Sequence, residues 1–166
     1  MRKFITLFII CVLFFILDNT LIPFFAIRNY YPSLLFIFCI LYSLINGSWE
    51  GIWLGVFAGL LQDLYFYHGF GVNPFTNMLV CAAAGYIGIG IFKEKFLIPV
   101  VSVFGLAMVK GTLIFSILYI NTVYMPYDKI IFNSVYDLVI AVIMYRWIYK
   151  LTQKEYMQRK WSFYDK

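Results

Sequence analysis

Residues 4–17 read FITLFIICVLFFIL, a run without a charged side chain that follows directly on the basic pair Arg2 and Lys3. A basic start before an apolar run is also the pattern of a secretory signal peptide. Here, however, the apolar character resumes at Leu21, and no small-residue cleavage site follows the run. The pattern therefore predicts a first helix that is retained in the membrane, over about residues 4–25.

Five further apolar segments follow, separated by short connections, at about residues 31–45, 50–66, 73–92, 96–120 and 129–150. A membrane-spanning helix needs roughly 17–25 residues. The second and third segments are short, so we expect one of them to be tilted, broken or only partly inserted. The predicted fold is an all-α membrane bundle of about six transmembrane helices over residues 1–150, followed by a basic cytoplasmic tail at 151–166.

Composition supports a membrane protein and excludes several other classes. Hydrophobic residues make up 63% of the chain and charged residues 13%, whereas a soluble domain is roughly half apolar and a quarter charged. Each ionised side chain in hydrocarbon costs at least a few kcal/mol, which explains the shortage of charge. The net charge of +5 does not indicate a nucleic-acid partner, because the basic residues gather at segment ends and in the tail.

The distribution of lysine and arginine predicts the orientation. With a cytoplasmic N-terminus and six spans, only Arg28 and Lys129 fall on the outer side, and Lys110 lies inside the fifth segment. The other ten fall on the inner side: Arg2, Lys3, Lys93, Lys95, Arg146, Lys150, Lys154, Arg159, Lys160 and Lys166. Cytoplasmic loops carry the excess of positive charge, so we expect both termini in the cytoplasm and the protein in the bacterial inner membrane.

Four ionisable residues lie deep inside the apolar segments: Asp18, Asp63, Lys110 and Asp137. At 1.5 Å of rise per residue, each lies roughly 20 Å from the inner end of its segment. Intramembrane charges usually pair or line a hydrated cavity. We therefore expect a polar layer in the outer half of the membrane, with Lys110 paired with Asp63 or Asp137. The alternative is that each acid reaches water alone near a helix end, which is favoured for Asp18 and left open for Asp137.

Glycine recurs every four residues at Gly51, Gly55 and Gly59, and Asp63 continues the series. Small residues at this spacing let another helix approach closely, since lipid supplies no hydrophobic drive for helix association. We expect this face to pack inside the bundle, with a partner protein as the alternative. A second group of small residues around Gly85 predicts that the fourth segment packs there against the third.

Catalytic and metal-binding patterns are missing from the sequence. It contains no nucleophile elbow and no zinc-protease motif. Cys11, Cys39 and Cys81 lie singly within apolar runs and lack metal-ligand spacing. We therefore predict a non-enzymatic protein without a cofactor or a metal, and give little weight to acid–base chemistry by Asp63 with Asp137.

Several short motifs together resemble the family of the bacterial rod shape-determining protein MreD. They are Tyr31-Pro32-Ser33, the stretch GIWLGVFAGLLQDL at residues 51–64, Gly69, Gly71-Val72-Asn73-Pro74 and Gly85-Tyr86. The glycine stripe that ends in Gln62-Asp63 is the most specific of them. Length, basic termini and the number of apolar segments agree with this family over nearly the whole chain.

The resemblance implies a scaffold subunit of the cell-elongation complex, which controls cell shape and peptidoglycan synthesis. It implies an MreC-like single-span partner and, directly or indirectly, a RodA-like glycosyltransferase, a class B penicillin-binding protein and MreB filaments. It also implies a fold similar to the substrate-binding S-components of energy-coupling-factor transporters. The matching positions have structural or interface roles in this interpretation: Gly55, Gly59, Gln62, Asp63, Gly69, Gly71 and Gly85.

The alternative function is a small-molecule, vitamin-type binding subunit of a membrane transporter. It predicts an enclosed outward cavity, lined by the polar layer around Asp63 and Lys110. Such subunits often carry an alanine-rich motif in their first helix. Residues 4–15 contain neither alanine nor glycine, and the scaffold is therefore preferred.

Overall fold

The computed structural model describes residues 2–26, 30–65, 70–90, 97–120, 126–154 and 157. Within them the chain forms α1 (Arg2–Thr20), η1 (Ile22–Phe25), α2 (Leu34–Asn46), α3 (Ser48–Tyr65), α4 (Val72–Gly90), α5 (Leu97–Ile120) and α6 (Asp128–Thr152). The predicted all-α class is confirmed. Gly69 and nearly all of the tail 151–166 beyond Lys154 lie outside the described residues.

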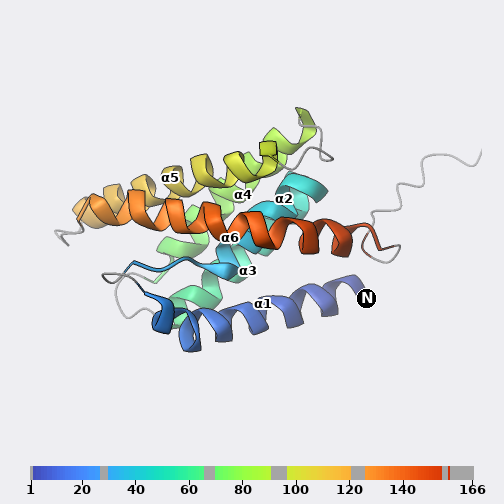
Figure 1. Cartoon of the computed structure of the whole chain (residues 1–166), viewed down its shortest axis with the longest axis horizontal. Helices are drawn as coiled ribbons and strands as arrows, with labels where there is room; N and C mark the ends of the chain where they lie inside the picture. Colours follow the sequence, from blue (N-terminus) through green and yellow to red (C-terminus); the bar gives the residue numbers. More distant parts are fainter. Residues whose placement is uncertain are drawn as a thin grey trace, which may run out of the picture.

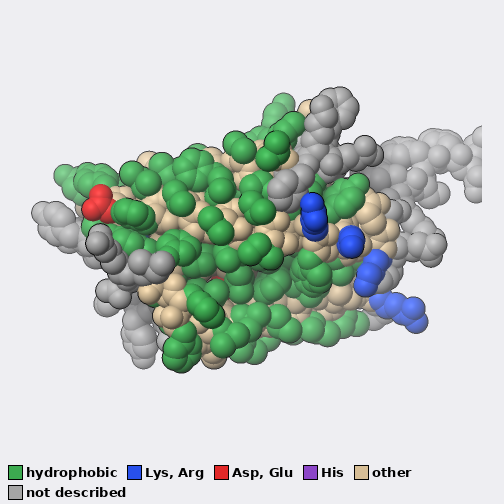
Figure 2. Space-filling model, viewed as in Figure 1, with side chains coloured by type: hydrophobic (Ala, Val, Ile, Leu, Met, Phe, Trp, Pro, Cys, Tyr) green, Lys and Arg blue, Asp and Glu red, His purple; other side chains and the backbone are tan. Residues whose placement is uncertain are grey.

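The helices form one bundle in which the axes of α1, α5 and α6 run in roughly the same direction, with α5 packed against α6 (Figure 1). The start of α1 and the end of α6 lie at the same end of this bundle. We call this the basic end, because its described residues include Arg2 and Lys3 of α1 and Lys150 of α6. Figure 2 shows lysine and arginine side chains gathered there, while hydrophobic side chains cover most of the visible face.

Four of the described helices are long and apolar enough to cross a membrane: α1, α4, α5 and α6. The chain is thus a multi-pass membrane protein. The α3 helix has 18 residues but carries Glu50, Gln62 and Asp63, which lower its hydropathy. The prediction of about six transmembrane helices is therefore correct in the number of helices, whereas only these four meet the length and hydropathy of a span.

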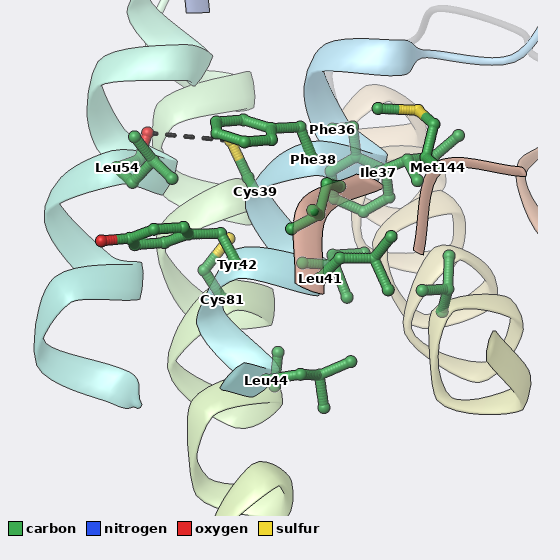
Figure 3. Packing of buried hydrophobic residues seen from close by; sticks show 14 of the residues in the cluster. Phe36, Ile37, Phe38, Cys39, Leu41, Tyr42, Leu44, Leu54, Cys81 and Met144 are labelled. Carbon is green, nitrogen blue, oxygen red and sulfur yellow. Dashed lines mark hydrogen bonds between the residues drawn. The ribbon is translucent and has the colours of Figure 1, made fainter. Parts of the chain in front are cut away.

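The α2 helix is the core of the bundle. It has 13 residues, about 20 Å at 1.5 Å per residue, whereas the hydrocarbon layer is about 30 Å thick. Every side chain from Leu35 to Ile45 is buried. Figure 3 shows its side chains between Leu54 of α3 and Cys81 of α4 on one side and Met144 of α6 on the other. Because the other helices surround it, α2 needs no polar face.

Local sequence defines both ends of α2. Ser33 is extended (φ −114°, ψ 105°), and its hydroxyl accepts a hydrogen bond from Phe36 N, as an N-cap residue does. The preceding residues run as an extended segment between α1 and α6 (Figure 1), so that α2 starts well inside the bundle. At the other end Gly47 has φ 98°, a conformation that glycine adopts without strain.

The glycine stripe of α3 packs inside the bundle. A Cβ atom on Gly55 would lie 2.9 Å from Asn77 O and 3.0 Å from Cys81 Sγ, both in α4. A Cβ on Gly59 would overlap the backbone of Pro74, and one on Gly85 would overlap the backbone of Ser48. The α3 and α4 helices therefore approach so closely that these positions have room only for hydrogen.

Gly51 belongs to the same stripe and faces the side chain of Ser43 in α2. The stripe thus contacts both α2 and α4. Because its surface is occupied by helices of the same chain, contact with a partner protein has to use other faces.

An ion pair ties α1 to α3 at the basic end. Lys3 Nζ lies 2.7 Å from Glu50 Oε1, and both side chains are largely buried. Glu50 Oε2 also accepts a hydrogen bond of 2.7 Å from the hydroxyl of Tyr42 in α2. Three helices are therefore joined at this end through the single carboxylate of Glu50.

Candidate functional site

Asp18, near the end of α1, binds the first turn of α2. Its Oδ1 accepts from Leu34 N at 2.7 Å, and its Oδ2 accepts from Leu35 N at 3.1 Å and from Ser33 Oγ at 3.0 Å. The first N–H groups of a helix have no partner within the helix and favour a negative charge. Asp18 therefore caps α2 from a neighbouring helix, and its carboxylate is not isolated as the alternative had it.

Ser33 is the centre of the network. Its hydroxyl donates to Asp18 and accepts from Gln62 Nε2 of α3 at 3.0 Å, and its backbone N–H donates to Asp137 Oδ1 of α6 at 3.1 Å. One residue thus connects α1, α2, α3 and α6. The motif Tyr31-Pro32-Ser33 contains this residue but does not by itself indicate the role. The position of Ser33 directly before an apolar run is the N-cap signal that could have identified it.

Gln62 extends the network to α4 and α5. Its Oε1 accepts from Asn77 Nδ2 at 3.0 Å and from Lys110 Nζ at 3.4 Å. The Lys110 ammonium also lies 4.0 Å from the centroid of the Phe36 ring, in a cation–π arrangement. Asn77 and Phe36 were not predicted as site residues, since no sequence pattern distinguishes them from other core residues.

Lys110 does not form the expected ion pair with Asp63 or Asp137. In the described part of the chain, the only ammonium–carboxylate contact within 4.0 Å joins Lys3 to Glu50. Lys110 therefore remains a buried cation with a single long hydrogen bond to the amide of Gln62.

Asp63 binds the start of α4 and not Lys110. Its Oδ2 accepts from Gly71 N at 2.5 Å and its Oδ1 from Asn73 Nδ2 at 2.8 Å. Gly71 has φ 102°, a conformation unfavourable for residues with a Cβ atom. Asp63 thus holds the turn before α4 against α3, and the predicted polar layer divides into two groups that share α3 and α4.

A cavity of about 660 Å³ lies at the end of the bundle opposite the basic end, beside the start of α2. Its polar lining includes Asp18, Ser33, Gln62, Lys110 and Asp137, but not Asp63. The cavity exists because α2 begins well inside the bundle and leaves the space beyond its first turn unfilled by a helix. Among the described residues, no group of three His, Cys, Asp or Glu side chains could hold a metal.

This combination defines a class: a polytopic α-helical membrane protein whose buried polar side chains link one helix to another. Comparison with known families gives a more specific result. The family model of the rod shape-determining protein MreD matches residues 1–155, and the chain belongs to this family. The predicted resemblance is thus confirmed, and membership implies a role in determining rod shape.

Two other comparisons gave no match. Neither a curated protein nor a solved structure matches the chain. The expected similarity to the S-components of energy-coupling-factor transporters therefore stays a prediction.

Proposed function

We propose that this protein is a non-enzymatic scaffold subunit of the cell-elongation complex in the bacterial cytoplasmic membrane. It controls cell shape and peptidoglycan synthesis through helix-face contacts with an MreC-like single-span protein. This protein associates directly or indirectly with a RodA-like glycosyltransferase and a class B penicillin-binding protein. Its association with MreB filaments is indirect. The observation that carries the proposal is the match to the MreD family over residues 1–155.

The use of the buried polar groups supports a scaffold. Asp18 holds α1 on α2, and Asp63 holds α3 on the turn before α4. Gln62 connects α2, α3, α4 and α5. Such contacts fix the relative positions of helices, and a scaffold needs fixed positions because it presents the same surface to each partner.

The α1 helix is the best candidate for the partner surface. Only Leu7, Cys11 and Phe14 are buried in it, although polar contacts fasten it near both ends, through Lys3 and Asp18. Its exposed side carries large apolar residues, namely Phe4, Ile5, Phe8, Ile9, Leu13 and Ile16. A helix that is fastened near both ends and has a broad apolar face suits contact with another transmembrane helix, and we propose that the MreC-like span lies there.

The distribution of charge supports cytoplasmic termini. Both described termini of the bundle lie at the basic end (Figures 1 and 2). Because the excess of lysine and arginine faces the cytoplasm, we propose that this end is cytoplasmic and that the cavity lies near the outer face of the membrane.

Site-specific photo-crosslinking in the living host tests the proposed surface. A photoreactive residue at Ile9 of α1 should yield an adduct with the MreC-like protein. The matched control is Ile143 of α6, which is also exposed and should yield mainly lipid adducts. Adducts with the partner from Ile143 and none from Ile9 would contradict the assignment to α1.

A further inference from the structure

The cavity contains polar groups that the protein itself leaves without full hydrogen bonding. Lys110 is only 9% exposed, and an ammonium has three donors, yet its described hydrogen bond is the single 3.4 Å contact with Gln62. Asn133 Oδ1 is buried and has no hydrogen-bond partner. Both residues line the cavity. A buried cation with one long hydrogen bond and a buried acceptor with none are costly, so a ligand that satisfies both is favoured.

The charges around the cavity restrict the ligand. Two carboxylates and two ammonium groups line it, from Asp18, Asp137, Lys110 and Lys129. The charges balance, so a head group without net charge fits best. Three hydrogen bonds from the start of α2 already occupy Asp18. The groups that remain for a ligand are therefore cationic at Lys110 and Lys129 and anionic or accepting at Asp137 and Asn133.

The rest of the lining is apolar. It includes Phe15 of α1, Pro23 of η1, Ile114 and Leu118 of α5, and Ile130 of α6. The volume of about 660 Å³ lies within the range of roughly 300–1,000 Å³ found for small-molecule sites. The ligand should thus have an apolar body beside its polar head.

We propose that this cavity binds the head group and adjoining apolar part of a zwitterionic amphiphile, with its anionic group at Lys110 and its ammonium group at Asp137 and Asn133. Two sources supply this chemistry: a membrane phospholipid, or a free small zwitterion. The inference does not rest on the proposed scaffold function, because it requires neither a partner protein nor a role in cell shape.

Native mass spectrometry of the full chain in mild detergent provides the test. The probes are phosphatidylethanolamine, phosphatidylglycerol with identical acyl chains, and free phosphoethanolamine. We expect one tightly retained phosphatidylethanolamine per chain, in preference to phosphatidylglycerol, which lacks the ammonium. Lys110→Met and Asp137→Asn should each weaken retention roughly tenfold to a hundredfold, as expected for the loss of a charge-assisted hydrogen bond.

Two further variants separate binding from folding. Leu118→Trp puts a larger side chain into the apolar lining of the cavity and leaves the polar network intact. It should also abolish the retention of phosphatidylethanolamine. Thr112→Val changes an exposed residue of the same helix that is not part of the lining and should bind as the wild type does. If free phosphoethanolamine binds and the same three cavity variants weaken its binding, the site is supported and its ligand is a soluble zwitterion. Equal retention of both lipids, unaffected by the three cavity variants, would overturn the proposal.

Discussion

Gly59→Ala should strongly destabilise the bundle, by about 3 kcal/mol, the upper part of the range for overpacking. A Cβ at this position would overlap Cα and N of Pro74 and lie 2.6 Å from the carbonyl carbon of Asn73. These are backbone atoms at the start of α4, so no rotation of a side chain can relieve the contact. The added methyl group would therefore force α3 and α4 apart.

The matched control is Gly105→Ala in α5, where nothing lies within 4 Å of the added Cβ. Alanine is a better helix former than glycine by about 1 kcal/mol, so this variant should be as stable as the wild type or slightly more so. The free energy of unfolding of both variants can be measured by titrating a denaturing detergent into mixed micelles and following the helix content by circular dichroism. If the two variants lost the same stability, the close contact of α3 with α4 would be refuted.

Asp18→Ala is expected to have the second large effect, a loss of about 3 kcal/mol. The substitution removes three hydrogen bonds to the start of α2, and each buried donor left without a partner costs about 1–3 kcal/mol. The positive end of the α2 dipole also loses its counter-charge. We expect the variant to unfold at a lower concentration of the denaturing detergent. We also expect faster hydrogen exchange at the amides of Leu34 and Leu35.

Two variants calibrate this result. Asp18→Asn keeps one accepting oxygen and should fall between the wild type and alanine. Asp128→Ala removes an exposed carboxylate from the first turn of α6 and should have an effect below about 1 kcal/mol. Unchanged exchange at Leu34 and Leu35 in Asp18→Ala would show that Asp18 does not cap α2.

The predictable part of the fold follows from hydropathy along the chain. Continuous apolar runs predict membrane helices, because lipid contact requires apolar side chains on every exposed face. The same reasoning cannot separate a helix in lipid from one enclosed by protein, since both are apolar all round. The short lengths of the second and third segments therefore predicted only that one of them is tilted, broken or partly inserted, whereas the structure encloses the 13 residues of α2 within the bundle.

The sequence predicted part of the grouping of the candidate site and none of its hydrogen bonds. Counting residues placed Asp18, Asp63, Lys110 and Asp137 at a common level, and all of them except Asp63 line one cavity. The hydrogen-bond partners depend on how each helix is rotated about its axis. A single carboxylate such as Asp63 does not reveal that rotation in the sequence, so its contact with Gly71 and Asn73, rather than Lys110, could not be deduced.

The backbone partners were also hidden. Asp18 binds N–H groups of Leu34 and Leu35, and every residue except proline offers such a group. Side-chain chemistry therefore gave no indication of this contact. The N-cap position of Ser33 was the one local signal that pointed to the start of α2.

A mild-detergent pull-down of the tagged chain from its native host, with mass spectrometry of the co-purifying proteins, tests the scaffold role most directly. A tagged, unrelated polytopic membrane protein serves as the control for nonspecific recovery. The proposed function predicts an MreC-like single-span protein at near-stoichiometric levels, together with cell-wall synthases. Recovery of transporter ATPase subunits, without any wall or shape protein, would contradict the scaffold and favour a transporter subunit.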